Sequence, residues 1–167
     1  PAAPGDLQAR LDRRWLPQWA RLVRGDGELA FRGSPRRYRW QASRFPLAGL
    51  HGLVGSRGAL LPLGGALSGQ GQLDLQPLWI TGTASVQQPL LLGLPGRRLQ
   101  WAGWYRHRHF GGEGRWMAER RGSVQIRLRG RQGADFWTRL EGRDLTPALL
   151  DQLQRLVGRE GRDAVLQ

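Results

Sequence analysis

The chain has 167 residues, a formal net charge of +13 and no Cys, and its pI is close to 11.8. Without Cys it can form neither disulfides nor zinc–thiolate sites, and no stretch approaches the roughly 20 apolar residues of a membrane-spanning helix. Hydrophobic residues make up 40% of the chain, which excludes a disordered composition. Apart from His, every cationic side chain is Arg. This excess predicts attraction to a polyanion: nucleic acid, lipopolysaccharide, anionic lipid or an acidic protein face.

Residues 5–23 predict a short N-terminal helix, because a capping residue is followed by apolar residues at helical spacing: Asp6, then Leu7, Leu11 and Trp15. Pro17 should end or kink this run. The chain starts at Pro1 without Met, which is compatible with a removed signal or anchor. We therefore expect residues 1–24 to be a helical segment or linker from such an anchor, and residues 25–167 to form a single β-rich domain.

From residue 25 to residue 141, apolar and polar residues alternate, most clearly in 37–42 and 124–129. Successive side chains of a strand project to opposite faces, so such segments bury one face and expose the other. Gly and Pro clusters separate the runs, which predicts an antiparallel all-β fold, a curved or sandwich-like sheet of about eight short strands. We expect the core to contain Tyr38, Trp40, Trp101, Ile126, Leu128, Leu149, Leu153 and Leu156. Four arginines are expected to face solvent: Arg37, Arg39, Arg127 and Arg129.

A second helix is predicted near the C-terminus, at about residues 147–157. Thr146 is a good N-cap, Pro147 occupies the first helical position and Gly158 follows as a stop. A weak recurrence of Gly-x-Gly-x-apolar has members that begin at Gly25, Gly69 and Gly112. It indicates either stacked supersecondary units or Gly-led turns that enter strands.

Catalysis and metal binding have little support in the sequence. Arg106 and Arg108 flank His107 and His109, which disfavours a cation at these imidazoles. Acidic residues such as Glu119 lie beside Arg, so exposed ion pairs explain them better than a general acid–base pair. The sequence contains no phosphate-binding loop and no nucleophile motif. We expect no enzyme activity, no cofactor and no bound metal.

Arg next to aromatic residues is the remaining signal, for example in residues 36–40 and 104–110. Such runs can form a stacking platform with phosphate contacts, or a strand with an aromatic core face and an Arg solvent face. The candidate partner-binding residues are Arg37, Arg39, Arg106, Arg108, Arg127 and Arg129. The apolar runs 59–63 and 89–95 are either buried strands or one wall of a groove for acyl chains.

Residues 45–53 (FPLAGLHGL) and 65–73 (GALSGQGQL), with the late segments 99–103 (LQWAG) and 145–150 (LTPALL), resemble the type II secretion system protein N family, GspN. The likeness extends loosely from residue 25 to the end of the chain. It implies a β-rich periplasmic part behind an inner-membrane anchor, an accessory role in the secretion apparatus, and no catalytic motif. The same patterns also resemble AsmA-like envelope proteins, whose long β-sheets handle lipid.

The sequence thus favours a non-enzymatic periplasmic accessory component of a bacterial, type II-like protein secretion apparatus. The protein would bind other secretion-system subunits and would be held at the inner membrane of a Gram-negative envelope by a missing N-terminal anchor. An AsmA-like lipid-handling module with an apolar groove is the first alternative, with anionic lipid or lipopolysaccharide as its partner. An Arg/aromatic nucleic-acid-binding β domain is the second alternative and ranks below both. Co-purified phospholipid would favour the first alternative, and steeply salt-dependent binding of oligonucleotide the second.

Overall fold

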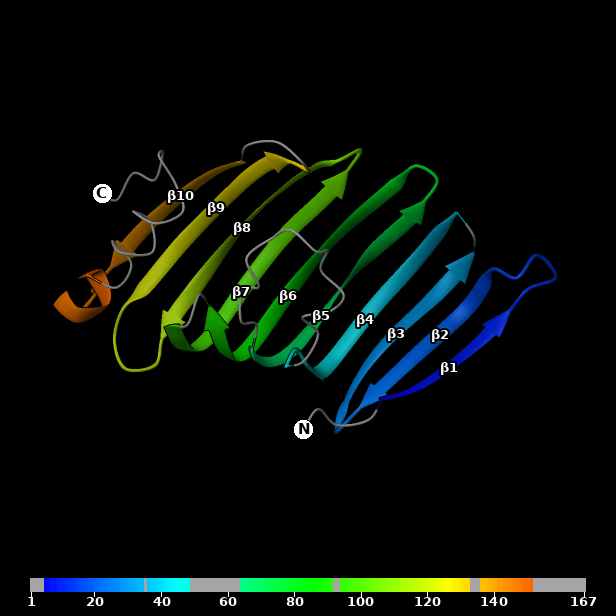
Figure 1. Cartoon of the computed structure of the whole chain (residues 1–167), viewed down its shortest axis with the longest axis horizontal. Coiled ribbons are helices and arrows are strands. Elements are labelled where there is room, and N and C mark those ends of the chain that lie inside the picture. Colours follow the sequence, from blue (N-terminus) through cyan, green and yellow to red (C-terminus); the bar gives the residue numbers. More distant parts are fainter. Residues whose placement is uncertain (1–4, 35, 49–63, 92–93, 133–135, 152–167) are drawn as a thin grey trace.

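The computed structural model describes residues 5–34, 36–48, 64–91, 94–132 and 136–151. Within these residues ten strands form one antiparallel sheet, in which the strand order follows the order in the chain (Figure 1). The strands are β1 (Gly5–Leu11), β2 (Pro17–Arg24), β3 (Gly27–Ser34), β4 (Arg37–Pro46), β5 (Gly64–Leu75), β6 (Leu78–Leu91), β7 (Leu94–Arg106), β8 (His109–Ala118), β9 (Ser123–Arg131) and β10 (Phe136–Arg143). The antiparallel all-β class is confirmed, with ten strands in place of about eight.

The predicted N-terminal helix is wrong, because residues 5–24 contain the hairpin of β1 and β2. A spacing of four residues keeps two apolar side chains on one face of a strand as well as of a helix, so the N-terminal leucines fit both. Asp12 favours the hairpin: its carboxylate oxygen accepts hydrogen bonds from the backbone N–H groups of Arg14 (2.8 Å) and Leu16 (2.9 Å) and closes the turn. Because β2 also pairs with β3, this hairpin belongs to the same sheet as the rest of the strands.

The C-terminal helix begins where the sequence predicts. Residues 147–151 are helical. The hydroxyl of Thr146 accepts a hydrogen bond from the Leu149 N–H at 3.4 Å, and its carbonyl accepts one from the Leu150 N–H at 2.9 Å. These contacts make Thr146 the N-cap. Other predicted features lie outside the described residues: Leu153, Leu156, Gly158 and the apolar run 59–63.

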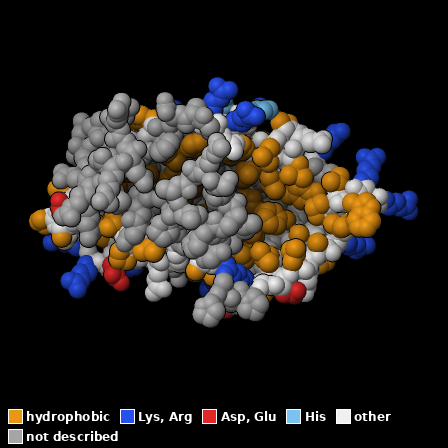
Figure 2. All heavy atoms as spheres, in the orientation of Figure 1, with side chains coloured by type: hydrophobic (Ala, Val, Ile, Leu, Met, Phe, Trp, Pro, Cys, Tyr) orange, Lys and Arg blue, Asp and Glu red, His pale blue; other side chains and the backbone are white. Residues whose placement is uncertain are grey.

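The sheet has an apolar face and a polar face, and Figure 2 shows hydrophobic side chains gathered on the face turned to the viewer. The buried hydrophobic side chains are Tyr38, Ala42, Phe45, Val86, Leu94, Trp116 and Val124. The predicted core residues Trp40, Trp101, Ile126 and Leu128 are half-buried on the apolar face. Leu149 packs against the cluster of Leu94, Trp116 and Val124. On the opposite face, four arginines are exposed as predicted: Arg37, Arg39, Arg127 and Arg129.

Glycines inside the strands allow large indoles to lie against the apolar face. The ring of Trp101 lies over Gly103, Gly112 and Gly114, and a Cβ at any of these positions would be 2.5 Å from a ring atom. Trp40 covers Gly82 on β6 in the same way, and its Nε1 donates a hydrogen bond to the Thr81 carbonyl at 3.1 Å. The sheet therefore packs Trp on Gly across neighbouring strands.

Two of the three members of the Gly-x-Gly recurrence share register rows of the sheet, because Gly71 aligns with Gly112 and Gly69 with Gly114 through the intervening strands. Gly25 lies in the turn between β2 and β3, at a φ of 59°. Gly69 and Gly112 lie inside β5 and β8. A turn that enters a strand explains the first member, whereas the other two lie within paired strands.

Candidate binding surfaces

A row of side chains crosses the polar face from β2 to β10, and Arg and Trp dominate it. Each member is the register partner of the next, so neighbours are about one strand spacing, or roughly 5 Å, apart. We call it the Arg–Trp row: Trp19, Arg32, Arg39, Gln72, Thr81, Trp104, Gly111, Arg129 and Trp137. The row contains no acidic residue, and its arginines form no ion pair with the residues that the structure describes.

The structure brings the candidate arginines to the polar face, with one exception. Arg39 and Arg129 belong to the Arg–Trp row. Arg106 belongs to the row beside it, where Trp79, His109 and Arg131 follow one another in register. The exposed side chains of Arg37 and Arg127 lie on the same face. Arg108 lies instead in the turn between β7 and β8, at a φ of 67°.

The contacts of these arginines are weak or leave the guanidinium accessible. Arg106 lies over the Trp79 ring, with its Cζ 5.9 Å from the ring centroid, which is a cation–π contact. The Nε of Arg37 is 3.6 Å from Asp74 Oδ1, and the Nε of Arg127 is 4.0 Å from Glu113 Oε2. The pair of Arg127 and Glu113 is exposed and contributes little to stability, and the Arg37 side chain is itself 69% exposed although Asp74 is mostly buried. The arginines therefore remain available to a ligand.

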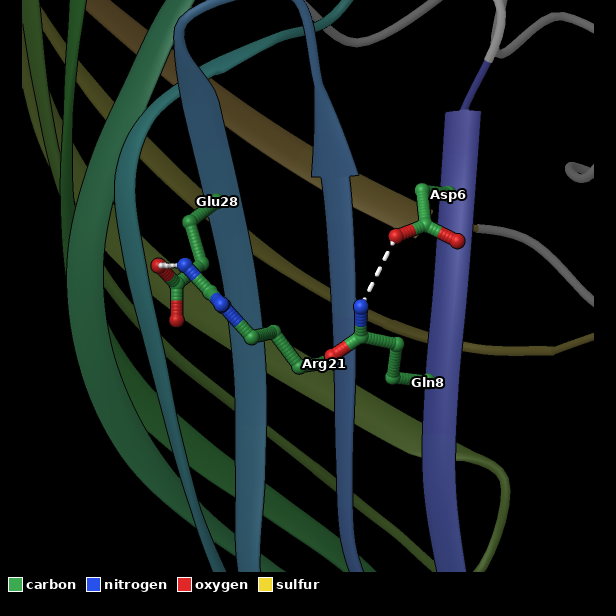
Figure 3. Close-up of polar contacts among 4 residues, drawn as sticks. All are labelled: Asp6, Gln8, Arg21 and Glu28. Carbon is green, nitrogen blue, oxygen red and sulfur yellow. Dashed lines mark hydrogen bonds and ion pairs between the residues drawn. The ribbon is translucent and has the colours of Figure 1, made fainter.

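Acidic groups on β1 and β3 are not members of the Arg–Trp row and are engaged with other side chains, as Figure 3 shows for Asp6 and Glu28. Glu28 accepts a hydrogen bond from the Arg21 guanidinium at 2.8 Å, and Asp6 accepts one from the Gln8 amide at 2.9 Å. The hydrogen bond and the charge of Glu28 raise the pKa of Arg21 above its usual value. Positive charge is thus compensated around Arg21 but not along the row.

The sequence placed Trp104 in an Arg/aromatic run, but it assigned neither Trp104 nor Trp137 to the polar face. Trp104 and Trp137 are 43% and 46% exposed. The Trp104 ring lies against Gly111 of the neighbouring strand, where an added Cβ would meet ring atoms at 2.9 Å. The signal was available, because Trp101 and Trp104 are three residues apart in one strand and must point to opposite faces.

The polar face also carries open hollows. One, of about 600 Å³, is lined by hydroxyl, amide and charged side chains that include Ser85, Gln100 and Arg115. Another, of about 920 Å³, includes Arg39 and Gln41 among its lining residues. In the part of the chain that the structure describes, no group of three or more His, Cys, Asp and Glu could hold a metal ion. These hollows offer hydrogen bonds and charge to a ligand.

Comparisons with protein-family models, with curated proteins and with solved structures give no match to the chain. The resemblance to the secretion protein N family and to AsmA-like proteins therefore depends on the sequence patterns alone. Among the described helical residues, no helix is both long and apolar enough to cross a bilayer.

Proposed function

We propose that the chain is a non-enzymatic binding component of a type II-like bacterial secretion apparatus, and that its polar face recognises an acidic partner subunit in the periplasm. The observation that carries the proposal is the Arg–Trp row. It places Arg32, Arg39 and Arg129 on one face without an acidic neighbour in the row. The resemblance to secretion protein N supplies the cellular setting, and the row supplies the binding chemistry.

The chemistry of the row suits protein recognition. Guanidinium groups pair bidentately with carboxylates, and Trp and Arg are the residues that most often dominate the energy of an interface. Exposed charges mainly accelerate and orient association, and they are screened over about 8 Å at physiological ionic strength. We therefore expect partner binding to weaken as salt rises from low to physiological concentration.

Charge reversal in the row tests this proposal. The double variant Arg39→Glu/Arg129→Glu should lose an acidic partner from envelope extracts in a pull-down. The control Arg120→Glu/Arg121→Glu makes the same charge change in the exposed turn between β8 and β9 and should retain the partner. Circular dichroism should show the same sheet content for both variants, because exposed substitutions rarely cost more than about 0.5 kcal/mol.

Two outcomes would contradict the proposal. Equal partner recovery by the row variant and the control would remove the row from the mechanism and leave the sheet edges at β1 and β10 as the binding surface. Tight, steeply salt-dependent binding of single-stranded oligonucleotide that the row variant abolishes would instead identify a nucleic-acid ligand.

A further inference from the structure

The simple order of the sheet brings the turns that follow odd-numbered strands to one end. Because successive strands run antiparallel and pair in chain order, the turns after β1, β3, β5, β7 and β9 share this end. In Figure 1 the arrowheads of these odd-numbered strands follow one another along the upper and right borders of the sheet. With neighbouring strands about 4.8 Å apart, the turns extend over about 40 Å. We call this end the turn rim, defined by Leu11, Asp12, Arg13, Arg14, Trp15, Arg36, Arg37, Asp74, Leu75, Leu78, Trp79, Ile80, Arg106, Arg108 and Arg131.

The turn rim carries most of the large hydrophobic side chains that the structure exposes. Trp15, in the turn between β1 and β2, is 81% exposed, and Leu78, at the start of β6, is 43% exposed. Leu78 pairs with Leu75 across the turn between β5 and β6. Trp79, the next residue of β6, points to the opposite face of the sheet. The rim is therefore apolar on both faces of the sheet, although single exposed hydrophobic residues would need no explanation.

The turn rim is also strongly basic. Of its arginines, only Arg37 has an ion pair with a described residue, Asp74. The other described carboxylate of the rim, Asp12, accepts hydrogen bonds from backbone N–H groups of its own turn. The opposite end of the sheet mixes both signs, for example in the pair of Asp26 and Arg44 at 3.3 Å. In Figure 2 the red acidic side chains of this view lie at its left and lower borders, and the upper border shows Arg and His.

We propose that the turn rim docks on a lipid bilayer that carries anionic headgroups. Trp prefers the membrane interface, where its ring meets acyl chains and its N–H meets water. Arg side chains beside it reach phosphate headgroups while their stems cover apolar surface. A soluble polyanion would pair with the arginines but would leave Trp15, Leu75 and Leu78 in water. A bilayer satisfies both sets of side chains at once, and this inference stands independently of the proposed secretion partner.

Vesicle co-sedimentation tests the proposal with defined probes. The 167-residue chain should pellet with phosphatidylglycerol-containing vesicles and not with pure phosphatidylcholine vesicles. Each Arg near an anionic surface strengthens binding about fivefold, so Arg13→Gln/Arg14→Gln should weaken binding by more than tenfold. The matched control Arg120→Gln/Arg121→Gln, in the turn between β8 and β9 at the other end, should weaken it far less.

The apolar contribution has its own matched pair of variants. Trp15→Ser/Leu78→Ser should weaken vesicle binding at least tenfold, because inserted apolar groups contribute in proportion to their buried area. Leu7→Ser removes an exposed leucine of β1 that is not part of the turn rim and should leave binding unchanged. All these positions are exposed, so the variants should retain the stability of the parent chain.

A fluorescent label shows directly which end meets the bilayer. Because the chain contains no Cys, Gln76→Cys in the turn between β5 and β6 and Arg120→Cys at the other end each create one labelling site. A nitrobenzoxadiazole probe at residue 76 should brighten and shift to the blue with anionic vesicles, and a probe at residue 120 should not. The proposal would be overturned if the probe responds only at residue 120 or equally at both positions. It would also be overturned if the chain binds neutral vesicles equally well or binds no vesicles. Loss of vesicle binding with intact partner capture would separate this proposal from the secretion role.

Discussion

Packing of Trp101 on strand glycines makes a sharp prediction about stability. An Ala Cβ at position 112 would be 2.5 Å from Trp101 Cζ2, 2.8 Å from its Cε2 and 2.6 Å from the Ala102 carbonyl oxygen. Over-packing of this kind costs about 1–3 kcal/mol. Contacts this short on two sides put Gly112→Ala near the upper limit, at about 3 kcal/mol of the free energy of unfolding.

The indole can be removed to separate its share of this cost. Trp101 is half-buried, so Trp101→Ala should cost about 3 kcal/mol, at the low end for a large aromatic residue. In that background, Gly112→Ala meets only the carbonyl oxygen, and its cost should fall to about 1 kcal/mol. The double variant should therefore be about 2 kcal/mol more stable than the sum of the single effects predicts.

Urea unfolding followed by far-UV circular dichroism measures these values without depending on Trp fluorescence. The denaturant slope should stay constant across the cycle, so that shifts in midpoint report stability alone. Gly5→Ala is the matched control, because its Cβ would meet Leu22 Cδ1 at an ordinary 3.4 Å. It should cost no more than about 0.5 kcal/mol and should add independently to Trp101→Ala. Strict additivity of Gly112→Ala and Trp101→Ala would refute the packing described for this indole.

Further predictions concern the core and the helix cap. The Tyr38 hydroxyl is buried without a hydrogen-bond partner among described residues, so Tyr38→Phe should stabilise the protein by about 1 kcal/mol in urea unfolding. Burial raises the pKa of Tyr38 in the folded protein, so the phenol ionises at a lower pH in the unfolded chain. The parent protein should therefore lose stability above about pH 10. Tyr38→Phe should abolish this pH-dependent loss. Phe45 is 2% exposed, and Phe45→Ala should cost about 3–5 kcal/mol by leaving a cavity, detectable as a lower urea midpoint. Thr146→Ala should cost about 1 kcal/mol by removing the N-cap; hydrogen exchange at Leu149 should accelerate, and unchanged exchange would contradict the cap.

The alternation of residue types was enough to predict the faces of the sheet. A period of two assigns each side chain to a face without any knowledge of its neighbours, so residues 37–42 and 124–129 could be placed correctly. The N-terminal hairpin could not be distinguished from a helix by the same rule, because apolar residues four apart fit both. Asp12 carried the missing information, as a turn-forming residue between two short runs.

The Arg–Trp row could not be predicted from the sequence. Its members come from strands far apart in the chain, and their alignment depends on the register of every intervening pair. An irregularity between Ala42 and Phe45 shifts the register of β4 and β5. A one-residue error in any pairing between β4 and β9 would separate Arg39 from Arg129. Only the assembled sheet shows that these side chains share a row.

Pairing in strict chain order gives this sheet a modular construction. Each strand contacts mainly the strands before and after it, so the entropy cost of closing long loops stays small. Insertion or removal of a whole hairpin would leave every other strand with the same direction and the same outward face. Gain or loss of a single strand would reverse the direction of all later strands and move their turns to the other end. The length of such a sheet can therefore change by pairs of strands without loss of its polar face or its basic end.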